Sequence, residues 1–287
     1  MTEYEPTRQS KPNQYLITGA LDYMNSINRI VSLRLLAKGG LFECGKSAVT
    51  LHNIALALAY LEAGEAQIAK QIITGIEANI GFAQFGNGLL VLNSPYGENM
   101  YAGDSALVSV FYSRRGRKDL AEKLVEGIEN HIGFATRNGH RFVKPNEGMK
   151  KGPLLTFTNA ALASAYANLG QKGRADELLE TIEKEIKCIE FDDKTKLYKS
   201  GYANDLVMTQ ANAMLATAYL ETGNEKGVNV MGGICRHIKN QYGKRGTFVR
   251  QSNVNVKASK DDLILDTALV ARMYWLRAKY EEDRNGQ

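Results

Sequence analysis

Apolar, small and polar positions recur along this chain in the same order five times. Each copy runs from a small or polar residue, through apolar and small residues, to a tyrosine. The tyrosines are Tyr60, Tyr112, Tyr166, Tyr219 and Tyr274, at spacings of 52, 54, 53 and 55 residues. Seven residues before them stand Asn53, Ser105, Asn159, Asn212 and Thr267, and four residues after the first four stand Gly64, Gly116, Gly170 and Gly223. Because glycine enters the left-handed region without steric cost, each copy predicts a helix that ends shortly after its tyrosine.

A second pattern follows these helices: isoleucines four residues apart, with charged or polar residues between them. It occurs at residues 76–80, 128–132 and 182–186, and more weakly at 234–238. A single apolar stripe indicates an amphipathic helix that covers a core with one face. The tyrosine helices, in contrast, are apolar or small on nearly every side, as in NIALALAYL and ALASAYANL. We therefore expect an inner ring of tyrosine helices and an outer ring of isoleucine helices.

Each repeat is longer than a simple helical hairpin, which has a period of about 34 residues in tetratricopeptide-type arrays. The additional residues hold a short strand-like run and a polar loop, always between an isoleucine helix and the next tyrosine helix. The strand-like runs are residues 89–93, 141–144, 196–199 and 247–251. These insertions are therefore predicted to lie on one edge of the fold.

The two ends of the chain predict how the repeats are arranged in space. Residues 15–37 form an outer-type helix without an inner partner, and residues 261–280 form an inner-type helix without the polar face that caps an open array. Joining these two helices satisfies both. The prediction is an all-α fold, a closed (α/α) toroid of about five helical hairpins with short β-like insertions on one rim. Residues 1–14 are expected to form a flexible arm, and residues 15–287 a single domain.

The repeated order of inner helix, outer helix, strand and loop, as in LYKSGYANDLVMTQANAMLATAYLETGN, resembles the (α/α) toroids of the six-hairpin glycosidase type. That group includes unsaturated glucuronyl hydrolases and sugar epimerases, with alginate-lyase-like toroids close to it. The resemblance covers residues 15–280 and concerns architecture, with five helix pairs here where the group usually has six. No catalytic signature matches, so no residue of the family is transferred to this chain.

Composition narrows the classes of partner. The net charge of +5 on 287 residues is a mild basic bias that suits anionic small molecules or sugars, and the basic residues form no aromatic-interleaved patch typical of nucleic-acid binding. No apolar stretch is long enough to cross a membrane and the N-terminus has no apolar core, so we expect a cytoplasmic protein. Three cysteines without metal-site spacing favour a reducing compartment. No metal site and no cofactor are expected.

Carboxylates at the edge where the inner helices begin are the candidates for catalysis. Hydrolysis of a glycosidic bond needs one protonated and one ionised carboxyl group across the sugar, and burial in the mouth of a toroid would separate their pKa values. The candidates are Glu98, Asp104, Asp205 and Asp266. The alternative for Asp104 and Asp205 is a capping or first-turn role at a helix start.

Residues of the same edge are predicted to bind the ligand, because amides, carboxylates, cations and aromatic rings together suit a polar saccharide. They are His52, Asn53, Tyr96, Tyr101, Glu147, Tyr202 and Arg250. Asn53 and its equivalents have a second interpretation, in which their side chains bond neighbouring backbone. The repeated tyrosines lie seven residues deeper and are expected to belong to the core.

The leading hypothesis is a saccharide-binding toroid whose candidate reaction is the hydrolysis of a small, acidic oligosaccharide; the ligand is a small saccharide or another polar anionic molecule. One alternative is a non-catalytic helical-repeat scaffold that binds a protein partner. Another is a uronate lyase that uses His52 with Asn53 and a mouth tyrosine, Tyr101 or Tyr202. The sequence leaves the oligomeric state and the identity of the substrate open.

Overall fold

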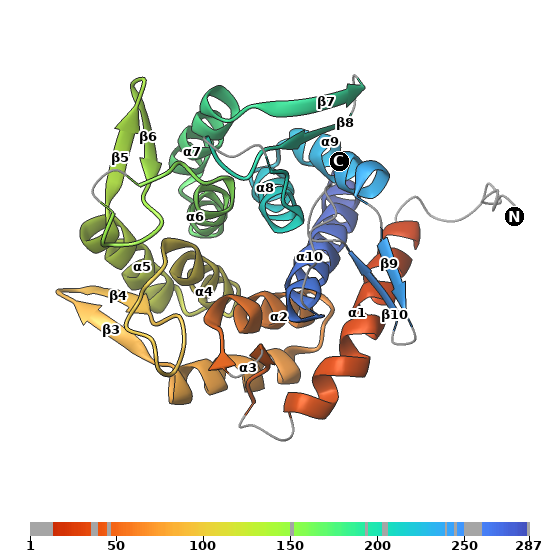
Figure 1. Ribbon diagram of the computed structural model, residues 1–287, viewed down its shortest axis with the longest axis horizontal. Helices are drawn as coiled ribbons and strands as arrows, with labels where there is room; N and C mark the ends of the chain where they lie inside the picture. The colour runs from red at the N-terminus through yellow and green to blue at the C-terminus, as the bar shows by residue number, and fades with distance from the viewer. Residues whose placement is uncertain are drawn as a thin grey trace, which may run out of the picture.

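A computed structural model gives the fold of this protein and describes residues 14–35, 40–44, 47–149, 152–192, 195–202, 206–238, 240–243, 246–249 and 260–285. Within these residues, two concentric layers of helices surround a common axis (Figure 1). The inner helices are α2 (Thr50–Glu62), α4 (Ala102–Arg114), α6 (Thr156–Asn168), α8 (Thr209–Glu221) and α10 (Lys260–Asn285). The outer helices are α1 (Gln14–Leu35), α3 (Ala66–Asn79), α5 (Lys118–Gly127) with the short π-helix Ile128–Ile132, α7 (Lys172–Glu185) and α9 (Lys226–His237).

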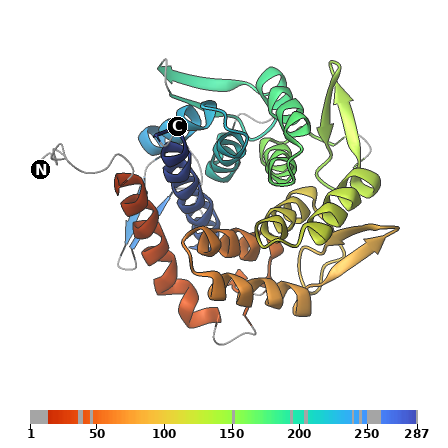
Figure 2. The ribbon, with the colours of Figure 1, turned by 180° about the vertical axis from the view of Figure 1, so that it is seen from behind.

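The inner ring is closed. Every inner helix packs against the next one along the chain, and α10 packs against α8, against α2 and against α1. The view from behind shows the same arrangement, with α1 outside α10 (Figure 2). The two terminal helices approach closely at Gly19, where an added Cβ would lie 2.9 Å from Cε1 of Tyr274, and the Tyr23 and Tyr274 ring centroids are 5.7 Å apart. The predicted pairing of the chain ends is therefore confirmed.

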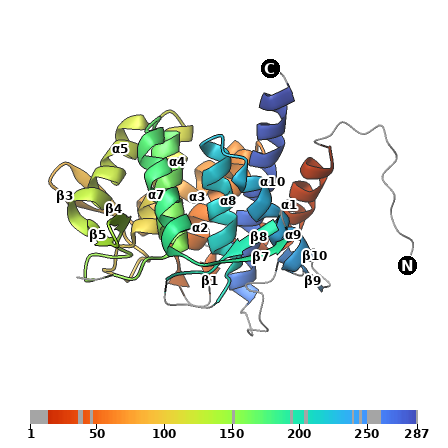
Figure 3. The same cartoon turned by 90° about the horizontal axis from the view of Figure 1, so that it is seen from above.

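A β-hairpin stands before each inner helix, so the predicted strand-like insertions are paired strands. The hairpins are β1–β2 (Glu43–Cys44, Ser47–Ala48), β3–β4 (Phe82–Phe85, Gly88–Val91), β5–β6 (Phe134–Arg137, His140–Val143), β7–β8 (Cys188–Asp192, Thr195–Tyr198) and β9–β10 (Asn240–Gly243, Gly246–Val249). The strand-like runs predicted in four of the repeats correspond to the second strands β4, β6, β8 and β10. Figure 3 shows strands gathered at one end of the ring, while the end of α10 projects from the other. We call the first end the hairpin pole and the second the opposite pole.

The repeated tyrosines tie the two layers together. Three of the five rings, Tyr112, Tyr166 and Tyr219, are buried at the inner helices and donate from their hydroxyls to the carboxylate of an outer-helix glutamate: Tyr112 to Glu77 at 2.6 Å, Tyr166 to Glu129 at 2.8 Å, and Tyr219 to Glu183 at 2.6 Å. These glutamates are the charged residues that follow the first isoleucine of each outer-helix motif. Burial raises the pKa of all three phenols, so they stay protonated donors.

The hairpins also fix the outer layer, because strands β4 and β8 cross the next outer helices at small residues. A Cβ added at Gly127 of the α5 helix would lie 2.2 Å from the carbonyl oxygen of Leu89, and one at Gly233 of α9 would lie 2.6 Å from that of Lys196. In α7 the equivalent position is Thr181, whose hydroxyl donates to the carbonyl of Arg141 at 3.1 Å. The close approach at Gly233 is thus to strand β8. No described helix is long and apolar enough to cross a membrane.

Candidate functional site

Polar side chains of four inner helices hold the preceding hairpin, or the residue next to it, at the hairpin pole. Asn212 accepts a hydrogen bond from the Tyr198 amide at 2.7 Å and donates to the Tyr198 carbonyl at 2.8 Å. Asn53 makes the same pair with Phe42, at 2.7 and 2.9 Å. Asn159 and Ser105 accept from the amides of Val143 and Val91 at 2.9 and 3.1 Å. The structure shows the second interpretation of Asn53, in which its side-chain amide bonds neighbouring backbone. This amide therefore positions the rim.

Three titratable side chains occupy the position immediately before Asn53, Ser105 and Thr267, the equivalent residues of three inner helices. They are His52 on α2, Asp104 on α4 and Asp266 on α10, and α2 packs against both α4 and α10. All three side chains are buried. The structure therefore brings two of the four candidate carboxyl groups, with one candidate ligand-binding histidine between their helices, to the same register position of three adjoining inner helices.

Asp104 has a buried and strongly perturbed carboxyl group. It is the third residue of α4 and is 4% exposed. No hydrogen bond or ion pair reaches its carboxyl group from the part of the chain that the structure describes. Burial disfavours the charged form and raises the pKa of Asp104 to about 7. A carboxyl group with this pKa is present in both protonation states near neutral pH, which is the property required of a general acid or base.

The rim loops carry the predicted aromatic residues. Tyr96, in the loop after β4, is 89% exposed, and Tyr202, in the loop after β8, is 47% exposed. The Arg137 guanidinium lies 3.1 Å from the Tyr202 ring centroid and covers one of its faces. Tyr101 immediately precedes α4 and forms an isolated bridge with Asn146. Tyr96 and Tyr101 share the loop between β4 and α4, whereas Tyr202 belongs to the loop between β8 and α8.

The remaining candidates divide into two groups. Glu98 is exposed, and Glu147 forms a hydrogen bond with His131, whose ring stacks on Phe85 with centroids 3.5 Å apart. Glu147 therefore joins the rim loop to the π-helix. Asp205 and Arg250 lie outside the described residues.

At the opposite pole, a network of charged and polar side chains spans the axis of the ring. Glu62, Arg114, Asn168 and Glu221 are the last residues of α2, α4, α6 and α8, and Arg272 joins them from α10. We call these five residues the polar ring. Every inner helix contributes one of them.

Ion pairs link the polar ring around the axis. The Arg114 guanidinium pairs with Glu62 and, at 2.7 Å, with Glu221. Arg272 pairs with Glu221 at 2.7 Å and approaches Glu62 at 3.8 Å. Nε of Arg114 donates to Asn168 at 3.0 Å, and Ser164 of α6 donates to Glu221. The two arginines and two glutamates balance in charge, which is the condition for burying them.

Burial acts differently on the two guanidinium groups of this network. Arg272 has no exposed surface, and burial lowers its pKa in spite of Glu221. Burial alone would lower the pKa of Arg114 as well, but Glu221 and Glu62 outweigh it and the pKa is raised. Sequence reasoning missed the polar ring. The signal was the polar residue two positions after four of the repeated tyrosines, inside otherwise apolar helices.

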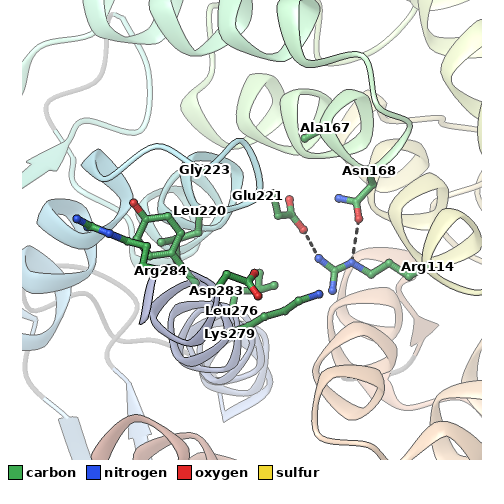
Figure 4. Close-up of a pocket in the computed structure, with 11 residues that line it drawn as sticks. Arg114, Ala167, Asn168, Leu220, Glu221, Gly223, Leu276, Lys279, Asp283 and Arg284 are labelled. Atoms are coloured by element: carbon green, nitrogen blue, oxygen red, sulfur yellow. Dashed lines mark hydrogen bonds and ion pairs between the residues drawn. The ribbon is translucent and has the colours of Figure 1, made fainter. Parts of the chain in front are cut away.

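A pocket of about 570 Å³ opens at the opposite pole, over the polar ring (Figure 4). The last three turns of α10 form one wall, because α10 extends past the ends of the other inner helices. The lining consists of Arg114, Ala167, Asn168, Leu220, Glu221, Gly223, Leu276, Lys279, Tyr280, Asp283 and Arg284. None of these residues was a candidate from the sequence. Within the described ranges, no three His, Cys, Asp or Glu residues converge as metal ligands do.

Comparison with known proteins identifies the class of fold. No family model and no curated protein sequence matches this chain. A family 76 glycoside hydrolase from a bovine Bacteroides thetaiotaomicron strain matches with a TM-score of 0.56 at 8% identity, over 93% of this chain and 78% of that one. The endo-beta-1,4-glucanase CMCax from Acetobacter xylinum matches with a TM-score of 0.56 at 12% identity, over 93% and 99% of the two chains. A family 105 glycoside hydrolase from C. acetobutylicum ATCC 824 matches with a TM-score of 0.51 at 10% identity, over 90% and 93%.

These neighbours belong to the (α/α) toroid glycosidase class, and the predicted resemblance in architecture is confirmed. At such low identities the similarity concerns the fold. It transfers neither a substrate nor a catalytic residue to this chain.

Proposed function

We propose that this protein binds a saccharide at the hairpin pole and hydrolyses its glycosidic bond, with Asp104 as the proton donor. The observation that carries the proposal is the Asp104 carboxyl group: it is buried, lacks a partner among the described residues, and has its pKa raised to about 7. The toroid fold shared with glycoside hydrolases supports the assignment of the reaction.

Asp266 is the proposed second carboxyl group. Glycoside hydrolysis requires a carboxylic acid that protonates the leaving oxygen and a carboxylate that attacks the anomeric carbon or activates a water. Asp266 occupies on α10 the register position that Asp104 occupies on α4, and it is 1% exposed. The two groups therefore come from helices that flank α2, at the same depth of the ring.

The rim supports binding of an oligosaccharide. Tyr96 and Tyr202 expose aromatic rings at the hairpin pole, and such rings pack against the apolar faces of sugars. The Arg137 guanidinium beside Tyr202, which also pairs with Glu185 at 3.5 Å, adds a cation to the rim, and a cation there favours a saccharide that carries a carboxylate. A small, acidic oligosaccharide is thus the proposed substrate.

Reducing-end release from a panel of neutral and uronate-containing oligosaccharides tests this proposal. We expect the wild type to cleave a member of the panel, and Asp104→Asn to lose at least about 100-fold in rate, as expected for removal of a general acid. Asp266→Asn should lose activity as well. Asp119→Asn is the matched control, because Asp119 is exposed on the outer helix α5 and should leave the rate unchanged. Full activity of the Asp104 variant would overturn the proposal.

One observation favours a non-catalytic scaffold as the second candidate. The polar ring spans the axis at the opposite pole, so the ring of helices is closed there by charged side chains. A scaffold of this kind would bind a protein partner and leave every saccharide in the panel intact. A uronate lyase is supported less, because Asn53, the amide assigned to the uronate carboxyl, is bound to backbone.

A further inference from the structure

The pocket over the polar ring is a second site that the proposed reaction does not use. It opens at the C-terminal ends of the inner helices, whereas Asp104 and Asp266 lie near the N-terminal ends of theirs. We propose that this pocket binds the oxyanion group, phosphate or carboxylate, of a small molecule. Binding at this pocket does not depend on the proposed hydrolysis.

Arg114 supplies the first set of donors. A guanidinium group carries five N–H bonds. Among the described residues, Asn168, Glu62 and Glu221 accept one each. Two N–H donors on the terminal nitrogens are left for a ligand, and Arg114 lines the pocket. The two glutamates hold the group in place, which lowers the cost of ordering it when a ligand binds.

Lys279 supplies the second set of donors. Its side chain extends across the pocket toward the Arg114 guanidinium (Figure 4). Asp283 lies one helical turn further on, at the spacing of a favourable ion pair, yet the two residues form none. No acceptor for the Lys279 ammonium lies in the part of the chain that the structure describes. Two cations that point toward each other repel, and an anion bound between them would replace that repulsion by two attractions.

The other charges of the pocket are one cation and two carboxylates. Arg284 is paired with Glu225 at 3.5 Å, Glu221 is engaged by both arginines and by Ser164, and Asp283 lies one helical turn beyond Lys279. The C-terminal ends of α4, α6 and α8 add partial negative charge, which is spread over exposed carbonyl groups and decays within one turn. The full positive charges of Arg114 and Lys279 line the pocket itself.

The volume and the lining of the pocket indicate the size and character of the rest of the ligand. The cavity of about 570 Å³ falls within the range of small-molecule sites, roughly 300–1,000 Å³. Leu220 and Leu276 offer apolar wall, and Asn168 and Tyr280 add polar groups. The site therefore suits a metabolite-sized phosphate ester or carboxylate better than a bare ion.

Titration calorimetry with four probes tests the inference: inorganic phosphate, glucose 6-phosphate, glucuronate and glucose. We expect the wild type to bind phosphate, and Lys279→Gln to bind it about tenfold more weakly, the effect of losing one charged hydrogen bond. Lys123→Gln removes the same charge from an exposed position on the outer helix α5 and should change nothing. Tighter binding of glucose 6-phosphate than of glucuronate identifies a phosphate site, and the reverse order a carboxylate site. Absence of anion binding by the wild type, or equal weakening by the two lysine variants, would overturn the inference.

The two proposals fail separately. Asp104→Asn should abolish hydrolysis and leave phosphate binding unchanged, while Lys279→Gln should weaken phosphate binding and leave hydrolysis of the best oligosaccharide unchanged. If phosphate binding instead follows the Asp104 substitution, the anion lies at the hairpin pole and the pocket proposal is wrong. If glucose binds with the affinity of glucose 6-phosphate, the charges of Arg114 and Lys279 are not used.

Discussion

The Arg272 guanidinium of α10 lies 2.7 Å from the Glu221 carboxylate of α8, and neither side chain exposes more than 4% of its surface. This ion pair joins the last inner helix of the chain to the one before it. Through Glu62, Arg272 also reaches α2, the first inner helix. The closure of the ring is therefore held by buried ion pairs as well as by the packing of the helices.

Replacing Arg272 by Met should destabilise the fold by about 3 to 5 kcal/mol, because Glu221 and Glu62 lose a buried cationic partner. Urea denaturation of Arg272→Met, Glu221→Gln and the double variant measures how the pair is coupled. We expect a coupling free energy of about 1 to 3 kcal/mol, since removing both charges leaves less uncompensated charge than removing one.

The exposed pair Lys118–Glu122 on α5 is the control for this cycle. Lys118→Ala should change the free energy of unfolding by at most about 0.5 kcal/mol. Strict additivity of the Arg272 and Glu221 substitutions would show that the pair does not contribute to closure.

Stability should depend on pH through Asp104. Its pKa in the folded state is about 7, above the ordinary value of 3.8. Between these two pH values the folded state retains a proton that the unfolded state has lost, so the free energy of unfolding falls as the pH rises from about 4 to about 7. The full effect is on the order of 4 kcal/mol.

Asp104→Asn has no titrating group at this position. Compared with the wild type in urea denaturation, it should gain relative stability as the pH is raised through this window and stay level above it. A difference between the two proteins that is independent of pH would mean that the carboxyl group is solvated and not perturbed.

Asn212 should be among the most sensitive positions of the rim. Its replacement by Ala removes the partners of the Tyr198 amide and carbonyl and should cost about 3 kcal/mol, because buried backbone groups are left unpaired. Asn212→Ser should cost less, since Ser105 serves the equivalent position of another repeat by accepting from the Val91 amide. Thermal unfolding gives the order, and hydrogen exchange at the Tyr198 amide locates the change. Equal stability of the Ala and Ser variants would contradict this role.

Gly127 should not tolerate a side chain. A Cβ there would lie 2.2 Å from the Leu89 carbonyl oxygen, a backbone atom that cannot move aside cheaply, so Gly127→Ala should destabilise the fold by about 3 kcal/mol. Gly173→Ala in α7 is the matched control, because nothing lies within 4 Å of its Cβ position. We expect that variant to gain up to about 1 kcal/mol from helix propensity. Chemical denaturation of both variants measures the contrast.

The two layers of helices were predictable because the same sequence pattern occurs several times along the chain. Tyr112 and Tyr166 mark buried helices through their apolar surroundings, and the motif beginning at Ile128 marks a helix with one buried stripe. The first strand of each hairpin was missed. Asn138–Gly139, whose backbone has positive φ at both residues, is the kind of turn that indicates a hairpin between two strands.

The candidate site was predictable only in part, because burial of a polar residue is decided by tertiary packing. Glu98 and Asp104 are six residues apart, yet one is exposed and the other is buried. The sequence shows both as acidic residues near a helix start. The pocket at the opposite pole depends on α10 extending past its neighbours, and the inner helix predicted at residues 261–280 ends five residues before the observed one.

In the proposed function, a saccharide binds at the hairpin pole with its scissile bond at Asp104. A crystal structure of Asp104→Asn soaked with the oligosaccharide that the wild type cleaves shows where the sugar lies. We expect sugar density against the N-terminal ends of α4 and α10, with a glycosidic oxygen within hydrogen-bond distance of the side chain at position 104. Sugar bound only in the pocket lined by Arg114 and Lys279, with none at position 104, would contradict it.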